Sequence, residues 1–324
     1  MSSWFRGNTH AHTELCGHAD SSPETVARWY LDHGYHFATL SEHNLFIDPA
    51  DVRLPEDRRE DFILVPGEEL TSEQVHMTAL NLEKALDHEA LGAARKIIAT
   101  WSRRLRDVGG VPIVNHPNWR WLVDVDDLRP QQQCRLFELY NGHPDTNDEG
   151  APGKLSTEAM WDTLLTEGKV TYAVASDDAH NFATWGRQLS NPGRGWVMVR
   201  ADELTSDAVT SAMDNGDFYA SSGVFLDVTV EPDAYRLAVD LEATRDEVGL
   251  PETVGQPLAD VYPEGLTVEF IGPSGKVLAS DHRPDATFAR SDEPYVRARI
   301  TWVEPGGDGR TGYRAWTQPA FRGA

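Results

Sequence analysis

Short apolar runs of the strand type repeatedly end in polar clusters that contain histidine, and this repetition restricts the folds open to the chain. The runs cover residues 4–9, 36–40, 62–65, 77–82, 111–114, 136–140 and 170–175, and they alternate with helix-like segments at 23–33, 89–107, 157–166 and 206–214. Strands that alternate with helices favour a mostly parallel α/β sheet or barrel. Barrel active sites are built at the C-terminal ends of the strands. The pattern therefore predicts an α/β domain with a functional site at one rim.

The C-terminal part of the chain has a different pattern. Apolar and polar residues alternate with a period of two at 226–230 and again at 296–302. This period is typical of antiparallel strands that bury one face. We therefore expect two domains, an α/β domain at 1–222 and a β-rich, sandwich-like domain at 223–324.

Charge and composition exclude several classes of function. The 324 residues carry 52 acidic and 29 basic side chains, a formal net charge of -23, which opposes binding to long nucleic acid or to anionic membranes. We find no signal peptide and no apolar stretch of roughly 20 residues that would span a bilayer. Two cysteines, Cys16 and Cys134, are too few for a disulfide scaffold. We expect a cytoplasmic, reduced protein with a small-molecule substrate, and the oligomeric state stays open.

His10 and His12 lie two residues apart at the end of the first expected strand. Side chains at i and i+2 of a strand point the same way, and histidine is the commonest ligand for zinc and related metals. A lone pair of this kind is more often structural than ligating. Similar groups follow the other strands, however, and they contain His18, His43, His76, His116, His180, Glu68 and Asp178.

These ordered motifs resemble those of the PHP family, named for polymerase and histidinol phosphatase domains. The resemblance covers residues 5 to about 223. It rests on Asn8-Thr9-His10-Ala11-His12-Thr13, Leu40-Ser41-Glu42-His43-Asn44, Pro66-Gly67-Glu68, His76, Asn115-His116-Pro117 and Ser176-Asp177-Asp178-Ala179-His180. It implies a distorted (β/α)7 barrel and a site for two or three divalent metals, followed by a small antiparallel β domain.

The resemblance also implies a ligand set. The first metal would be held by His10, His12, Glu68 and Asp178, and Glu68 would bridge to a second metal held with His76 and His116. The third metal would take His18, His43 and His180, with Asp20 as a rival to His18. Mixed histidine and carboxylate ligands suit zinc, manganese or iron, and the sequence does not choose among them.

The expected activity is that of a metal-dependent hydrolase, most simply a phosphoesterase acting on a small phosphorylated metabolite through a metal-activated water. His43 or His180 is a candidate proton donor to the leaving group. Arg187 and Arg194 are candidate clamps for an anionic substrate, and Glu138 is a candidate pocket residue.

Two other functions remain open at this point. The same metal centre could hydrolyse a carbamate, amide or carboxylic ester, which is favoured if Arg187 and Arg194 point away from the metals and the pocket is aromatic. The chain could also be a metal-binding or interaction module without catalysis.

Overall fold

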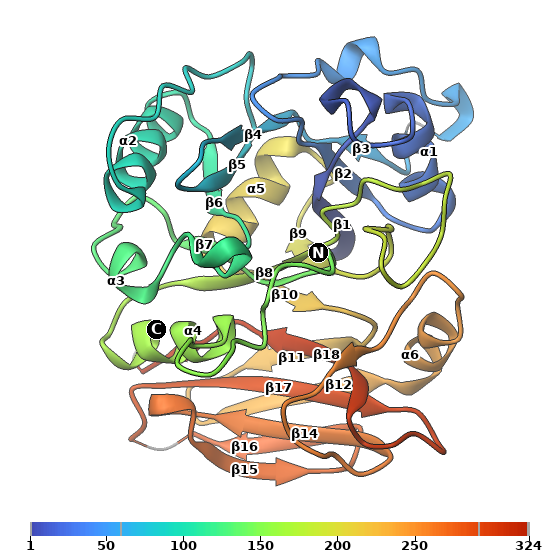
Figure 1. The fold of residues 1–324 in the computed structure, drawn as a ribbon. Coiled ribbons are helices and arrows are strands. Elements are labelled where there is room, and N and C mark those ends of the chain that lie inside the picture. The colour runs from blue at the N-terminus through green and yellow to red at the C-terminus, as the bar shows by residue number, and fades with distance from the viewer. Residues whose placement is uncertain (1, 59, 291, 323–324) are drawn as a thin grey trace.

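The computed structural model describes residues 2–58, 60–290 and 292–322, and these form two halves. An α/β half, built from the first 220 residues or so, lies at the top in Figure 1, and a β-rich half lies below it. The mixed α/β class predicted from the sequence is confirmed.

Two sheets build the α/β half. One contains β1 (Ser3–Ala11), β2 (Phe37–Leu40), β3 (Ile63–Leu64), β9 (Trp196–Ala201) and β10 (Phe218–Ser221), in the order β10-β9-β1-β2-β3. The other contains β4 (Gly67–Thr71), β5 (His76–Leu80), β6 (Val111–Val114), β7 (Leu136–Asn141) and β8 (Tyr172–Ser176), in that order. Neighbours are parallel within β1-β2-β3 and within β6-β7-β8.

No closed barrel forms among the described residues, so the expected (β/α)7 barrel is not confirmed. The two sheets approach each other through the isolated bridges Ala11↔Ala179 and His43↔Glu69. Strand β5 is antiparallel to both β4 and β6, contrary to the expectation of a mostly parallel sheet. Only residues 72–75 connect β4 to β5, and a parallel crossover needs a dozen or more residues. The two bridges nevertheless bring strand ends from both sheets to one rim.

The described part of the chain contains six α-helices, of which the last belongs to the β-rich half: α1 (Pro23–Asp32), α2 (Ala94–Asp107), α3 (Val125–Leu128), α4 (Thr157–Thr166), α5 (Ser206–Asn215) and α6 (Leu241–Val248). Helix α1 begins where Ser22 accepts a hydrogen bond from the amide of Thr25, as its sequence predicts. Helix α2 begins five residues later than expected because Gly92 has φ of 104°, outside the helical region. None of the helices found in residues 2–58, 60–290 and 292–322 has the length and apolar character needed to cross a membrane.

The β-rich half is antiparallel throughout, as its period-two pattern predicts. A three-stranded sheet contains β11 (Phe225–Val230), β12 (Ala234–Asp240) and β16 (Asp285–Ala289). The remaining strands are β13 (Gln256–Pro257), β14 (Gly265–Ile271), β15 (Val277–Asp281), β17 (Tyr295–Val303), β18 (Thr311–Thr317) and β19 (Ala320–Phe321). Strand β18 pairs with β10, so one sheet runs through both halves. A domain boundary at 222/223 falls in the turn after β10 and stays a prediction.

Buried ion pairs join the two halves. Arg297 of β17 is completely buried and donates hydrogen bonds to Asp162 on α4. Arg6 of β1 pairs in the same way with Glu247 on α6. Because an unpaired buried charge is costly, these pairs favour one relative placement of the halves.

Candidate metal centre

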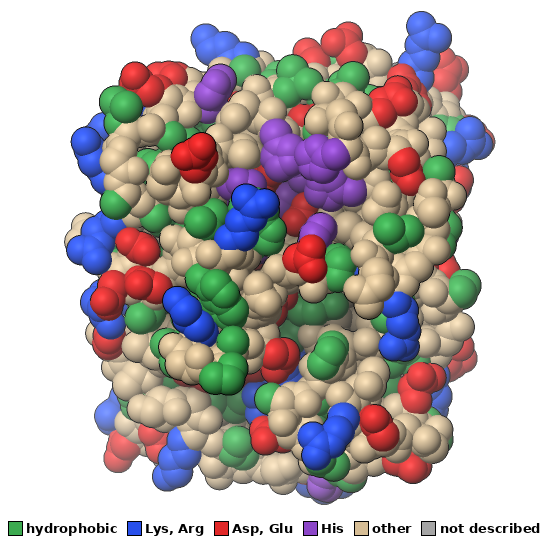
Figure 2. All heavy atoms as spheres, in the orientation of Figure 1, with side chains coloured by type: hydrophobic (Ala, Val, Ile, Leu, Met, Phe, Trp, Pro, Cys, Tyr) green, Lys and Arg blue, Asp and Glu red, His purple; other side chains and the backbone are tan. Residues whose placement is uncertain are grey.

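Side chains of the metal-ligating types gather at the rim where the strand ends meet. Figure 2 shows histidines clustered in a hollow of the upper half. Five groups have donor atoms that all lie within 4.8 Å of one another: His12/Cys16/His180, His18/His43/His180, His10/His116/Asp178, His10/His12/Glu69 and His43/Glu69/His76. The groups share members, so they form one continuous cluster. All seven histidines predicted from the sequence belong to it.

His10 and His12 form the buried floor of the cluster. Both are completely buried, and their Nε2 atoms lie 3.1 Å apart. Both nitrogens face the same carboxylate oxygen, Oδ1 of Asp178, over 3.2 and 3.3 Å. Burial alone would lower the pKa of His10, but Asp178, Glu138 and Glu69 raise it well above its ordinary value. This corner therefore concentrates negative charge around two imidazoles, a field that favours a bound cation.

Glu69, and not the expected Glu68, supplies the carboxylate at the centre. Oε1 of Glu69 lies 3.4 Å from Nε2 of His10, and Oε2 lies 2.6 Å from Nδ1 of His43. Glu68 instead accepts a hydrogen bond from the amide of Leu86 and belongs to none of the groups. Successive side chains of a strand point to opposite faces, so the neighbours Glu68 and Glu69 on β4 point to opposite sides of the sheet. An error of one residue in the expected position therefore selects the wrong glutamate as the ligand.

His76 and His116 flank Glu69 on the side of β5 and β6. The distances to Oε1 of Glu69 are 3.2 Å from Nδ1 of His76 and 3.4 Å from Nε2 of His116. His116 has φ of 22° and Asp178 has φ of 50°, both in the left-handed region that residues with a side chain rarely adopt. Strain of this kind persists where the surroundings hold it, and it often marks a functional site.

The structure brings together the three histidines expected for a third metal. His18, His43 and His180 form one of the five groups, with His18 exposed and His180 buried. Nδ1 of His180 donates to the carbonyl of Asp178, and its Nε2 is buried without a hydrogen-bond partner among the described residues. Burial and the neighbouring His12 lower the pKa of His180 to about 3, so the ring is neutral, the form that binds metal.

Asp20, the expected rival of His18, lies outside all five groups. Its carboxylate accepts hydrogen bonds from the backbone amides of Phe182, Ala183 and Thr184. Because the carboxylate of Asp20 is bound to the loop that follows His180, it does not act as a ligand in the cluster. The sulfur of Cys16, in contrast, lies close to His12 and His180.

Glu138 supports the cluster from below instead of lining a substrate pocket. His10 donates from Nδ1 to Oε1 of Glu138 over 2.8 Å, and the amide of His116 donates to Oε2 over the same distance. Glu138 is buried, and it does not border the pocket above the histidines. A carboxylate behind a histidine fixes the tautomer and orientation of the ring, leaving Nε2 of His10 free to bind metal.

A pocket of about 1000 Å³ opens above the cluster. Arg187 and Arg194, the expected anion clamps, do not line it. The guanidinium of Arg194 instead donates to the carbonyls of Gly142 and Gly186, because the loop at 186–191 folds back over it. The arginine that does line the pocket is Arg120, whose guanidinium lies 4.4 Å from the ring centre of Trp119.

The sequence reasoning missed Arg120, Glu69 and His143 as residues that face the cluster. Arg120 lies shortly after the motif Asn115-His116-Pro117. A position shortly after a histidine motif is also what made Arg187 and Arg194 candidates, so the same criterion could have identified Arg120. His143 borders the pocket with its ring centre 6.0 Å from that of His180. No local pattern distinguishes it from the structural histidines.

The donor set fits divalent metals. Nitrogen and carboxylate oxygen atoms converge from several strand ends, as zinc, manganese and iron sites require. Nε2 of His180 and Nδ1 of His12 are buried without hydrogen-bond partners among the described residues, a costly arrangement that a bound cation at the cluster would offset for His180.

No protein-family model matches the sequence, and a search of curated proteins finds no match. Among solved structures, the chain is similar to a two-domain protein from Bacteroides vulgatus that contains a predicted PHP-like metal-dependent phosphoesterase, at 14% identity and a TM-score of 0.50. That match covers 96% of this chain and 94% of the other, so the likeness extends through both halves. The expected resemblance to PHP proteins is thus confirmed at the level of the fold.

Two further structures match with lower scores. A candidate metal-dependent phosphoesterase from Bifidobacterium adolescentis has 12% identity and a TM-score of 0.39, covering 64% of this chain and 94% of its own. The lesion-specific endonuclease EndoQ from Pyrococcus furiosus has 12% identity and a TM-score of 0.41, covering 66% and 56%.

Proposed function

We propose that this chain, which has a PHP-like fold, is a metal-dependent hydrolase, and specifically a phosphoesterase acting on a small phosphorylated metabolite. The observation that carries the proposal is the convergence of seven histidines with Glu69 and Asp178 at the floor of an open pocket. A purely structural cluster would be satisfied internally, whereas this one holds a buried nitrogen of His180 without a partner among the described residues.

We keep the expected ligand sets with Glu69 in place of Glu68, because the carboxylate of Glu69 lies close to His10, His76 and His116. The first metal would be held by His10, His12, Asp178 and Glu69, the second by Glu69, His76 and His116, and the third by His18, His43 and His180. Zinc, manganese and iron all suit this set. Divalent cations bound there would supply Lewis acidity, which activates a water and stabilises negative charge on the scissile group.

The residues of the pocket wall have their own tasks. Arg120 presents a guanidinium, which binds phosphate oxygens through paired hydrogen bonds. Trp119 holds that arginine in place and packs against His76, with ring centres 4.9 Å apart. His43 and His180 both line the pocket. Where it is not bound to metal, His43 is placed to give a proton to the leaving oxygen, whereas a pKa of about 3 leaves His180 unprotonated and unsuited to that task.

The size of the pocket and the charge of the protein favour a small substrate. A volume of about 1000 Å³ accommodates a metabolite-sized ligand. The net charge of -23 opposes a long polyanion, since nucleic-acid binding depends on basic side chains that replace counterions.

A second candidate function is hydrolysis of a carboxylic ester, amide or carbamate at the same centre. The observation in its favour is that Arg187 and Arg194 lie outside the metal pocket, whose wall contains Trp119. We place it second because Arg120 supplies a positive charge at that wall, which a neutral ester does not need.

A panel assay separates these functions. The purified protein would be tested with phosphomonoesters, phosphodiesters, carboxylic esters and carbamates, each with added manganese or zinc. We expect turnover of phosphate esters that depends on metal. Turnover of a carboxylic ester or carbamate alone would establish the second function, and bound metal without any turnover would indicate a non-catalytic module. If the Arg120→Gln variant loses affinity for phosphate esters but not for carboxylic esters, this result would support the first function.

A further inference from the structure

A second cavity adjoins the metal pocket. This side cavity, of about 390 Å³, is bordered by Arg187, Gln188, Arg194, residues 140–144, residues 146–150 and residues 254–257. It shares His143, Pro144 and Gln188 with the wall of the metal pocket, so the two spaces are neighbours. Residues 254–257 belong to the β-rich half, which otherwise lies apart from the metal centre.

The two arginines of the side cavity have no carboxylate partner in the described part of the chain. Neither forms an ion pair with a described residue, whereas the buried or half-buried Arg6, Arg297 and Arg299 each pair with a carboxylate. Arg194 is 5% exposed, and its guanidinium donates only to two carbonyls and to Asn191. Its Nε is buried without a partner among the described residues. A buried guanidinium that contacts no carboxylate directly is costly, and an anion bound beside it would offset part of that cost.

The two arginines also act on each other. Burial is the main cause that lowers the pKa of Arg194, while Tyr140 and Asp177 act to raise it. The charge of Arg187 lowers it further, which places the two guanidinium groups within electrostatic reach. Two neighbouring guanidinium groups that form no ion pair with a carboxylate of the described residues are suited to bind a phosphate or carboxylate group.

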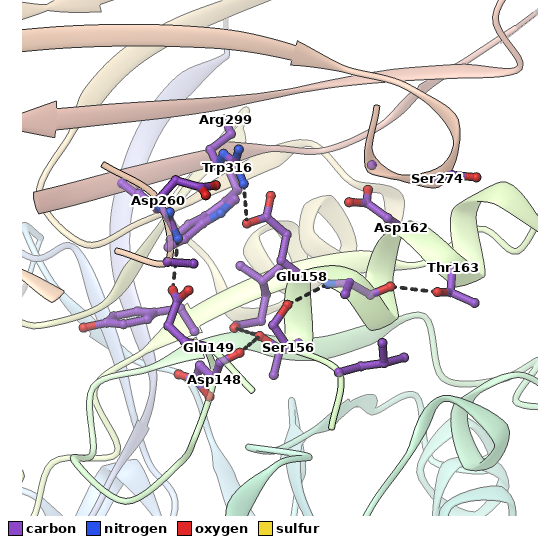
Figure 3. A pocket seen from close by; sticks show the side chains of 18 of the residues that line it. Asp148, Glu149, Ser156, Glu158, Asp162, Thr163, Asp260, Ser274, Arg299 and Trp316 are labelled. Atoms are coloured by element: carbon purple, nitrogen blue, oxygen red, sulfur yellow. Dashed lines mark hydrogen bonds and ion pairs between the residues drawn. The ribbon is translucent and has the colours of Figure 1, made fainter. Parts of the chain in front are cut away.

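The carboxyl groups at the cavity wall do not cancel this charge. Figure 3 shows Asp148 and Glu149 close together, at the edge of a neighbouring cavity between the two halves. Glu149 is already paired with Arg314 over 3.0 Å. Burial raises the pKa of Asp148 to about 8, so this group is largely neutral at pH 7. The side cavity is therefore positively charged within a strongly acidic protein.

We propose that the side cavity binds a second anionic group of the substrate, a phosphate or a carboxylate, while the reacting phosphoester lies at the metal centre. The inference rests on the proposed function and narrows it to a small substrate with two anionic groups. The segment 254–257 forms part of the cavity wall, so the β-rich half would take part in substrate selection.

Matched substrates test the proposal. Alkanediol bisphosphates and phosphorylated hydroxy-alkanoic acids of increasing chain length would be compared with alkyl monophosphates of the same length. We expect the second anion to raise kcat/KM about tenfold at one preferred length, the equivalent of a partly buried ion pair. The second anion that gives the larger increase in kcat/KM, phosphate or carboxylate, is the group that the cavity prefers. No gain at any length overturns the inference.

Variants localise the effect. In Arg187→Gln, the ratio of kcat/KM for the two-anion substrate to that for its monophosphate partner should fall about tenfold. Arg103→Gln is the matched control, because Arg103 is exposed on α2 and borders neither cavity. An unchanged ratio in Arg187→Gln overturns the assignment of the cavity.

A binding measurement separates this inference from the proposed function. Inorganic phosphate would be titrated calorimetrically into the full-length, metal-loaded protein. We expect a binding event that Arg187→Gln weakens about tenfold and Arg103→Gln leaves unchanged. If no phosphoester is hydrolysed, an event sensitive to Arg187→Gln supports the anion site while the phosphoesterase function fails. If phosphate binding is insensitive to Arg187→Gln, the anion site itself is refuted.

Discussion

Glu138 accepts a hydrogen bond from Nδ1 of His10 over 2.8 Å, so a buried carboxylate orients an imidazole whose other nitrogen faces the metal cluster. The charges of His10 and His116 act against the effect of burial and lower the pKa of Glu138. The hydrogen bond from Nδ1 to this carboxylate therefore makes Nε2 of the neutral His10 ring a stronger ligand.

The Glu138→Gln variant should keep the shape of this contact and lose its charge. We expect the affinity for metal to fall about 10- to 100-fold, the usual effect of removing a carboxylate behind a ligating histidine. Metal content after dialysis against graded chelator concentrations measures it. Glu203→Gln, at an exposed position, is the control, and equal metal retention in the two variants would contradict the proposed support.

Glu69→Gln and Glu68→Gln form a matched pair of adjacent, completely buried glutamates. Glu69 lies beside five cluster histidines, whereas Glu68 contacts the amide of Leu86, so only the first substitution should remove bound metal and turnover. Elemental analysis of the two purified variants tests this. Loss of metal in Glu68→Gln with retention in Glu69→Gln would restore the original expectation from the sequence.

His18→Ala should remove one metal selectively. His18 is exposed, and it joins the cluster only through His43 and His180. We expect the metal content to fall by about one equivalent per chain, whereas the combined His10→Ala and Asp178→Ala substitutions should remove most of it, since three protein ligands are typical of an open site. The metal-to-protein ratio of each variant, with unfolding curves to confirm folding, decides the outcome. An unchanged ratio in His18→Ala would exclude a third site at this position.

Arg120→Gln should raise KM for a phosphate ester by about tenfold with a smaller change in kcat, because one charged hydrogen-bond donor of the pocket wall is lost. Steady-state kinetics with an aryl phosphate and with a neutral aryl ester provide the comparison. An equal effect on both substrates would show that Arg120 shapes the pocket and does not bind phosphate.

The sequence alone could predict the cluster, because each histidine lies in a local motif at a strand end. His10 and His12 share a side of β1 as a direct consequence of strand geometry. The choice between Glu68 and Glu69 depends on which face of β4 meets the rim. That choice is made by the pairing of β4 with β5 and by the His43↔Glu69 bridge, which no local pattern records.

Features that depend on backbone bends or on contacts between distant parts of the chain could not be predicted from the sequence either. Arg120 reaches the pocket through a bend in which Arg120 and Trp121 have φ of 50° and 58°, values that a sequence of bulky residues does not indicate. Arg194 turns away from the metal pocket because Gly142 and Gly186, far apart in the chain, meet its guanidinium. The four-residue connection between β4 and β5 reverses the chain where a parallel strand was expected.

The junction between the halves gives a prediction about pH. Glu158 on α4 pairs with Arg297 and Arg299 of β17 over 2.8 and 3.1 Å, and Figure 3 shows its contact with Arg299. Burial acts to raise the pKa of Glu158, but these two guanidinium groups hold it well below its ordinary value. The folded state therefore favours the ionised carboxylate. This stabilisation is complete above the unfolded-state pKa of about 4.3 and is lost as the pH falls toward the lower folded-state pKa.

The Glu158→Gln variant should consequently be less stable than the wild type by about 3 kcal/mol at pH 7, the typical cost of removing one partner of a buried ion pair. The difference should stay constant above about pH 5 and shrink as the pH falls below about 4, because the wild type alone loses the ionised group. Urea unfolding across this range measures it. Glu167→Gln, at the exposed end of the same helix, is the control and should change stability little at any pH. A difference that grows on acidification would refute the assigned ion pair.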